Sequence, residues 1–455
     1  MDPVLTDAFG SSRNVKFKIY PPRLDIDLNL LGRLDAVLIT NEHLDHFHFP
    51  SLLKLERTVH IYVGDYTPNF VAENLQAAGF KVTRCKHNEW VDSKDLLFKF
   101  YVGCFNTPFW ERRVYHPYII SKSDPGARLI IQSDTLINPL FIKDIKEKKE
   151  KCPTLFVATN NSQIPHKGVP GAFDNIYPSE EDTSNQALQL LSEVTCTYTQ
   201  EMPEVRHVFF SGGAYIYDSP NSIPFKYSDI KSLGNLASQL SIGRRIHGLE
   251  PGESFNSLTG EILHEPWSNL DASQKKIYAE RLNSISGATI PSILKEAVTG
   301  NYKDEEETIA DIKLIENEHA LLARMIVGTA LGKVLLSLNN FIKGSLESER
   351  LLIIYRLSPT HKKAYHLNLN KVTFEETDID EEAILKYPFG VEWYLKDFAS
   401  ILKGEIQVWE VATTNMRQWY LGDKLDSPIA FFYKYFAEQI RPELANKITQ
   451  RHVLN

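Results

Sequence analysis

The stretch from Asp35 to His48, DAVLITNEHLDHFH, joins an apolar run to a group of potential metal ligands. Residues 35–40 form a continuous apolar run, which is typical of a strand buried on both faces. Residues 41–48 carry three histidines and two carboxylates. Sites in α/β proteins lie at the carboxyl ends of such strands, and imidazole with carboxylate suits zinc, iron or manganese. We therefore predict a metal site here, although a solvated polar turn at a helix start, with Asp45 near the helix N-terminus, also fits.

The composition excludes several classes of protein. The chain has 455 residues, of which 43% are hydrophobic, and this length suggests two or three domains. Fifty basic against 58 acidic residues give a net charge of −8, so nucleic-acid binding is not expected as the main function. The four cysteines, which form no Cys-x-x-Cys pair, suit a reducing cytosol and predict a cytoplasmic protein; they are Cys85, Cys104, Cys152 and Cys196.

The sequence shows no pattern typical of a membrane span. The first residues, MDPVLTDAFGSSRN, lack the basic and apolar regions of a signal peptide. The most apolar long helix candidate, residues 309–338, is interrupted by Arg324 and Lys333, whereas a span needs about 20 mostly apolar residues. We expect no membrane span.

The first half of the chain alternates short strands with helices. Apolar patterns predict strands at 14–20, 35–40, 60–65, 81–85, 95–103, 127–134 and 205–213, and helices at 49–55, 69–80 and 184–194. This alternation indicates an α/β domain whose helices cover its sheets. Residues 158–185, rich in Asn, Pro, Gly and Ser, are typical of a binding loop or lid.

A second domain is expected after a polar, turn-rich stretch at 250–273. We place the metal-binding domain at 1–265 and a smaller α+β domain, expected to help shape the substrate pocket, at 266–455. In the second domain, helical spacing extends over 309–338, strands are predicted at 351–357 and 364–370, and a helix is predicted at 391–405, closed by Gly404.

The order of the candidate ligands resembles the metallo-β-lactamase fold superfamily. Its pattern is His-x-His-x-Asp-His after a buried strand, then a later His, an Asp after a strand, and a last His. The matching residues in this chain are His43, Asp45, His46, His116 (in VYHPYII), Asp134 (in IIQSDT) and His247 (in RRIHGLEPGE). The resemblance covers roughly residues 14–260. It implies an αββα sandwich in which these six residues bind metal.

Asn41 stands where the superfamily pattern has its first histidine, as in the single-zinc subclass of metallo-β-lactamases. An amide oxygen is a weaker ligand than imidazole, so Asn41 and His48 are expected as weak ligands or as residues behind the ligands. One metal position would keep His43, His116 and a shared Asp134. The other would keep Asp45, His46 and His247, the composition of the facial triad in non-haem iron oxygenases. Whether one or two ions bind stays open.

Within the superfamily, the chain is similar to the CMP-N-acetylneuraminate hydroxylase group. The similarity lies in HIYVGDYTPNF, in the run from RRVYHPYII to IIQSDTLINP, and in the carboxyl-terminal strands with VEWYLKDFASILKGE. That group carries a Rieske iron–sulfur domain, of which this sequence shows only the form Cys85-Lys86-His87 without a following Cys-x-x-His. An oxygenase would therefore need an external electron donor.

Three functions follow from these patterns. The first is an oxygenase in which one or two iron ions act on a small-molecule substrate. The second is a zinc hydrolase, in which Asp45 and Asp134 orient a metal-bound water that attacks an ester, amide or phosphate. The third is a metal-free scaffold in which Asn41 marks loss of the site. The sequence favours the oxygenase slightly over the hydrolase and does not identify the substrate, the metal or the oligomeric state.

Overall fold

The structure is a computed structural model. It describes residues 1–6, 8–9, 17–20, 34–103, 114–159, 184–212, 214–217, 230–240, 245–249, 253–264, 296–337, 349–380, 384, 387–412, 415–420, 428–438 and 440–453. Most of the expected loop 158–185 and the expected domain boundary at 265 lie outside these residues.

The amino-terminal unit is built mainly of strands. Its strands are β1 (Ala8–Phe9), β2 (Phe17–Tyr20), β3 (Ala36–Ile39), β4 (His60–Gly64), β5 (Lys81–Cys85), β6 (Val91–Ser93), β7 (Leu96–Val102), β8 (Tyr115–Ser121), β9 (Arg128–Ile131), β10 (Leu155–Thr159), β11 (His207–Ser211), β12 (Ala214–Tyr217), β13 (Arg245–His247), β14 (Glu253–Phe255) and β15 (Ile262–His264). Its helices are α1 (Phe49–Leu53), α2 (Asn69–Ala77), α3 (Pro139–Lys146), α4 (Ser184–Glu201) and α5 (Ile230–Leu240).

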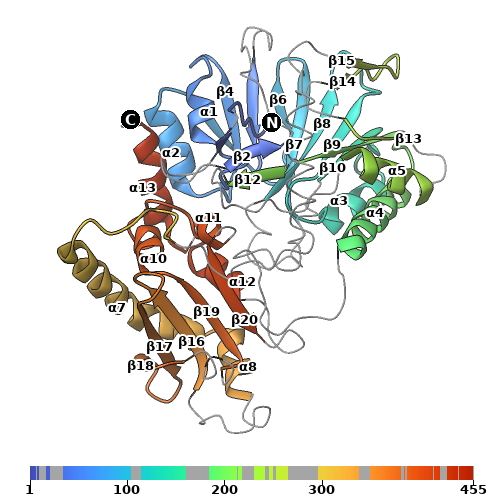
Figure 1. Ribbon diagram of the computed structural model, residues 1–455. Coiled ribbons are helices and arrows are strands. Elements are labelled where there is room, and N and C mark those ends of the chain that lie inside the picture. Colours follow the sequence, from blue (N-terminus) through green and yellow to red (C-terminus); the bar gives the residue numbers. More distant parts are fainter. Residues whose placement is uncertain are drawn as a thin grey trace.

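Two sheets of this unit pack face to face, and helices cover their outer faces (Figure 1). The parallel sheet β3-β4-β5 has α1 and α2 on one side. On its other side lies the seven-stranded sheet β13-β11-β10-β9-β8-β7-β6, whose far face packs against α3 and α5. Val37 and Ile39 pack toward the helices, whereas Leu38 packs toward the second sheet. A strand covered on both faces needs the apolar run seen in the sequence, and the predicted αββα layering is confirmed.

The carboxyl-terminal unit is a five-stranded sheet with helices on one face. Its sheet has the order β18-β17-β16-β19-β20. Its elements are α7 (Glu305–Val327), α8 (Ala330–Ser337), β16 (Glu349–Arg356), β17 (Lys362–Asn368), β18 (Thr373–Thr377), β19 (Phe389–Tyr394), α10 (Leu395–Leu402), α11 (Val408–Ala412), β20 (Met416–Tyr420), α12 (Pro428–Tyr435) and α13 (Pro442–Val453).

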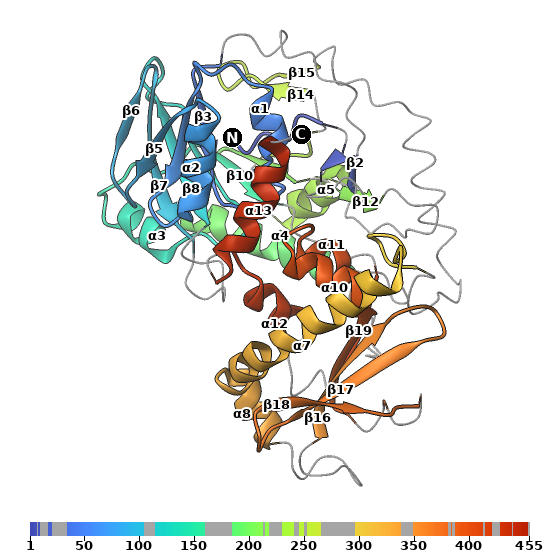
Figure 2. The same cartoon turned by 90° about the vertical axis from the view of Figure 1, so that its left-hand side faces the viewer.

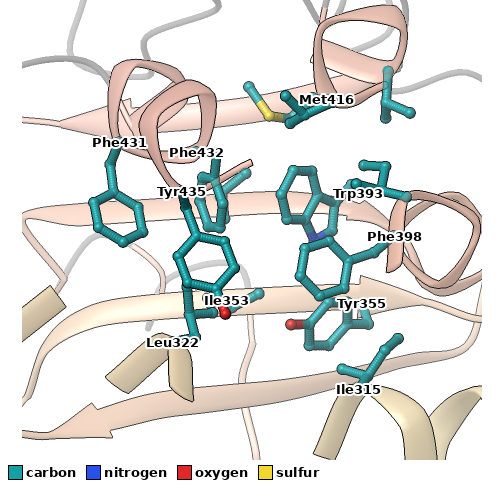
Figure 3. Close-up of a cluster of buried hydrophobic side chains, with 14 of the residues drawn as sticks. Ile315, Leu322, Ile353, Tyr355, Trp393, Phe398, Met416, Phe431, Phe432 and Tyr435 are labelled. Atoms are coloured by element: carbon teal, nitrogen blue, oxygen red, sulfur yellow. The ribbon is translucent and has the colours of Figure 1, made fainter. Parts of the chain in front are cut away.

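An aromatic core holds these helices on the sheet (Figure 3). Trp393 of β19 stacks on Phe398 of α10 with ring centroids 4.7 Å apart, and Phe432 of α12 meets Trp393 edge-on at the same distance. Tyr355 of β16 and Ile315 of α7 belong to the same core, and both are buried. The aromatic residues Trp393 and Phe398 therefore serve packing.

The helix predicted at 391–405 is partly wrong. Residues 391–394 belong to strand β19, and the helix α10 begins only at Leu395. All six residues of β19 are buried, because the strand pairs with β16 on one side and β20 on the other and is covered on both faces. In a short, continuous apolar run of this kind, the spacing of apolar and polar residues does not distinguish a strand from a helix.

The last helix connects the two units. Helix α13 packs against α2 and α1 of the amino-terminal unit (Figure 2). The Asn74 amide nitrogen donates to the Asn446 side-chain oxygen at 2.8 Å, and Ala445 joins the core around α1 and α2. In the described part of the chain, no single helix qualifies as a membrane span; only α7 and α8 taken together do, across a 77° bend.

Candidate metal centre

The loop after β3 lies where the two sheets of the amino-terminal unit meet. The backbone N–H of Tyr115, at the start of β8, donates to the Thr40 carbonyl at 3.0 Å. The Thr40 hydroxyl lies 2.8 Å from the Ser133 hydroxyl, which belongs to the loop after β9. Thr40 and Ser133 are both buried. These bonds bring the carboxyl ends of β3 and β9 together, so that Asp134 faces the histidines of residues 43–46.

The carboxylate of Asp134 is the centre of a group of four predicted ligands. Its Oδ2 lies 3.0 Å from His46 Nε2 and 3.5 Å from His43 Nδ1. Asp45 Oδ2 lies 3.7 Å from the same His46 nitrogen. Although burial alone would raise the pKa of Asp134, the adjacent His46 and His43 lower that pKa well below its usual range. Asp134 is therefore a permanent anion between two imidazoles.

Asp2 holds His46 from behind, a contact that the sequence did not predict. Asp2 Oδ2 lies 2.9 Å from His46 Nδ1 and also accepts the Thr40 hydroxyl at 2.7 Å. A carboxylate only accepts hydrogen bonds, so His46 Nδ1 carries a proton and Nε2 points at Asp134. Burial alone would lower the pKa of His46, but Asp134, Asp45 and Asp2 together raise it well above its usual value.

Both the oxygen and the nitrogen of the Asn41 side-chain amide form hydrogen bonds within the protein. The backbone N–H of His43 donates to Asn41 Oδ1 at 2.9 Å, and this bond fixes which end of the amide is oxygen. The Asn41 amide nitrogen then donates to Asp134 Oδ2 at 3.2 Å. Asn41 is fully buried. Of the two expected roles, this geometry favours a residue behind the ligands over a weak ligand.

His116 is buried beside the cluster, but its ring bonds to the backbone. Its Nδ1 accepts the backbone N–H of Ser133 at 3.1 Å, so Nε2 carries the proton. Nε2 lies 3.0 Å from the Leu136 carbonyl, to which it donates. Burial lowers the pKa of His116 to about 4. In this structure neither nitrogen presents a lone pair to a cation, so the expected ligand His116 instead positions the loop that carries Asp134.

His247 lies apart from the cluster. It pairs with Phe209 on β11, which pairs with Val157 on β10, which pairs with Ile131 on β9. Three strand spacings separate His247 from the strand before Asp134, about 14 Å. Its Nε2 lies 3.1 Å from His207 Nδ1, and its ring packs on Phe209. The expected grouping of His247 with Asp45 and His46 is therefore not what the structure shows.

The imidazole pair formed by His207 and His247 packs among aromatic rings. Burial lowers the pKa of both histidines, and Arg245 lowers it further. Phe255 of β14 packs on both rings. His207 is therefore a hydrogen-bonded histidine at the start of β11.

His48 has a structural role at the start of α1. The Ser51 hydroxyl accepts the backbone N–H of Leu5 at 2.7 Å and lies 2.6 Å from His48 Nδ1. His48 is buried, with 2% of its surface exposed. It connects the first residues of the chain to α1, and of the two roles expected for it this contact favours a residue behind the ligands over a weak ligand.

One pair of the group has the spacing of two ligands on a first-row transition metal ion. Two ligands that are adjacent on such an ion, each about 2.1 Å from it, lie about 3 Å apart. The 3.0 Å between His46 Nε2 and Asp134 Oδ2 matches this spacing. A cation would replace the proton that the surrounding carboxylates hold on Nε2. The donors are two imidazoles and two carboxylates, a set that suits iron, manganese or zinc.

The chain has no match among protein-family models or curated proteins. Among solved structures it is similar to the metallo-β-lactamase fold protein YhfI from Bacillus subtilis, at 11% identity over 47% of this chain and 73% of that one, with TM-score 0.30. It is also similar to a possible metal-dependent hydrolase from Veillonella parvula, at 13% identity over 57% of this chain and 99% of that one, with TM-score 0.34. CmlA, a diiron β-hydroxylase from Streptomyces venezuelae, matches at 13% identity over 63% of this chain and 53% of that one, with TM-score 0.31. These sequence identities and TM-scores are too low to indicate the activity of this chain.

Proposed function

We propose that this protein is a metal-dependent enzyme of the metallo-β-lactamase fold, and that it is an iron oxygenase acting on a small molecule. The observation that supports the proposal best is the group formed by His43, Asp45, His46 and Asp134. Imidazole and carboxylate donors without thiolate are the ligands of non-haem iron oxygenases. The resemblance to the hydroxylase group, drawn from the sequence, favours the same chemistry.

The residues around the group would hold and orient its ligands. When bound, iron would supply the activation of dioxygen. Asp2 keeps the Nε2 lone pair of His46 available by holding the proton on Nδ1. Asn41 and the Thr40–Ser133 pair keep Asp134 in place. Asp45, whose side chain is 52% exposed, lies between the group and solvent, where it can hold a proton or contact a substrate.

The enzyme proposed here would take its electrons from an external donor and would lie in the cytoplasm. An oxygenase needs an external reductant, because the described residues offer no second redox group. Three cysteines of the described part are buried free thiols, namely Cys85, Cys152 and Cys196. Free thiols persist in a reducing compartment, so we place the enzyme in the cytoplasm.

Metal analysis combined with oxygen consumption tests the proposal. The protein is purified without added metal, its iron and zinc contents are measured, and dioxygen uptake is followed with ascorbate or dithionite-reduced ferredoxin as reductant. We expect bound iron and an uptake that chelation abolishes. Zinc at near-stoichiometric amounts, with no oxygen uptake on either reductant, would contradict the oxygenase.

The second candidate is a zinc hydrolase, which the exposed carboxylate of Asp45 favours. Zinc lowers the pKa of a bound water to about 7. Asp45 lies 3.7 Å from His46 Nε2 and reaches solvent, so it is placed to accept a proton from such a water. Hydrolysis of nitrophenyl esters or phosphates by the zinc-loaded protein, and its loss in Asp45→Asn, would favour this function.

A further inference from the structure

A second group of metal-ligand side chains lies on the other side of the same loop. It consists of Glu42, His43 and Glu438, whose nearest ligand atoms all lie within 4.8 Å of one another. Glu42 is 2% exposed, and it directly precedes His43 in the loop after β3. Glu438 comes from the carboxyl-terminal unit, almost 400 positions later in the chain. The group therefore spans the two units of the protein.

Two features hold the three side chains in place. Leu44, between His43 and Asp45, is buried in the hydrophobic core of the carboxyl-terminal unit, so the loop is anchored there. Glu438 lies in the tight connection between α12 and α13. The backbone N–H groups of Ile440 and Arg441 both donate to the Ala437 carbonyl at 2.8 Å. The two carboxylates thus meet through packing and turn geometry.

We infer that Glu42, His43 and Glu438 form a second divalent-cation site, which shares only His43 with the Asp134 centre. Two carboxylates and one imidazole are a donor set that zinc, iron and manganese accept. Ligands on opposite sides of one such ion, each about 2.1 Å away, lie about 4.2 Å apart. The ligand atoms all lie within 4.8 Å of one another, so small rotations of the two glutamate side chains suffice to bring them within this span.

Two of the three side chains border a small hollow. Glu42 and Glu438 lie on the wall of this hollow, which has room for about one water-sized molecule. The rest of its wall is mostly apolar, formed by Leu44, Phe47, Phe49, Pro50, Phe70, Ala445 and Ile448, with Gln407 and Thr449. An ion there would bind the loop that carries His43 and His46 to the α12–α13 connection. Binding at this site would therefore stabilise both units together.

Zinc titration of chelator-stripped full-length protein tests the inference. Isothermal titration calorimetry gives the number of sites, and the thermal midpoint with and without zinc reports the coupling between units. Glu438→Gln removes one ligand, Glu443→Gln is the matched control on the exposed side of α13, and Asp134→Asn removes the other centre. We expect two zinc ions for the wild type and for Glu443→Gln. We expect at least tenfold weaker binding at one site and a smaller thermal shift for Glu438→Gln.

The outcomes separate this inference from the proposed function. If Glu438→Gln binds two zinc ions as tightly as the wild type, the Glu42–His43–Glu438 site is overturned. The site is also overturned if Glu438→Gln and Glu443→Gln lose the same amount of zinc affinity. Wild-type binding by Asp134→Asn overturns the other centre alone. If Glu438→Gln does not fold, Glu438→Asp, which keeps the charge but shortens the side chain, replaces it. Unchanged binding by that variant overturns the site.

Discussion

The carboxylate of Asp2 lies 2.9 Å from Nδ1 of His46, although the two residues are 44 positions apart in the chain. The backbone N–H of Asp2 donates to the Leu38 carbonyl, so the first residues of the chain run beside β3. Asp2 then bonds to Thr40 and His46 at the end of that strand. A carboxylate behind an imidazole fixes its tautomer and raises its basicity toward a metal.

Removal of the Asp2 carboxylate should weaken metal binding without removing any ligand. In Asp2→Asn, His46 loses the partner that holds its proton on Nδ1, and we expect about 10- to 100-fold lower metal affinity. Calorimetric titration with zinc measures the change. Asp35→Asn is the control, since it removes an exposed carboxylate that pairs with Lys94 on the surface. Equal affinities in Asp2→Asn and the wild type would show that Asp2 does not support His46.

His116 should matter more for stability than for metal binding. His116→Ala leaves the Ser133 N–H and the Leu136 carbonyl buried without their partner, which costs about 2–5 kcal/mol of unfolding free energy. Urea denaturation measures this loss. The fraction of His116→Ala that remains folded should hold as much metal per molecule as the wild type. A well-folded variant that lacks an ion would restore His116 to the set of ligands.

His319 should make the carboxyl-terminal unit sensitive to acid. This histidine is 5% exposed, lies 3.1 Å from the Tyr355 hydroxyl, and has a pKa that burial lowers to about 4. The unfolded chain takes up the proton near pH 6.5, so the stability is fully present above that pH and is lost as the pH falls toward 4. The loss at pH 5 should be about 2 kcal/mol.

His319→Gln separates this effect from other titrating groups. Glutamine does not titrate but can still hydrogen-bond to Tyr355. Urea unfolding followed by circular dichroism at pH 7.5 and pH 5 should show a smaller loss of stability for His319→Gln than for the wild type. Parallel pH profiles of the two proteins would mean that His319 does not titrate on unfolding.

The layers of the fold were predictable because each depends on local patterns. The apolar run at 35–40 specified a doubly covered strand, and Ile39 and Leu38 do pack on opposite sides of the sheet. The boundary at Tyr394 was not predictable in the same way. There a strand buried on both faces runs directly into a helix, and neither composition nor period changes at the junction.

The sequence predicted the site where the ligands are close together in the chain. It did not predict the site where the order of strands in the sheet determines whether a residue reaches it. His43, Asp45 and His46 share one loop, and Asp134 follows a strand of the facing sheet. His247 fits the expected order along the chain, but β13 lies at the far edge of the seven-stranded sheet. Asp2 and Glu438 carry no sequence signal at all, since only tertiary packing brings them to the loop.

The metal content of two variants tests the central claim most directly, namely that Asp134, and not His247, belongs to the metal centre. Wild type, Asp134→Asn and His247→Ala are purified side by side, checked for folding by circular dichroism, and analysed for iron and zinc. We predict that Asp134→Asn loses the metal of this centre while His247→Ala keeps the wild-type content. Loss of metal in His247→Ala together with retention in Asp134→Asn would contradict the account.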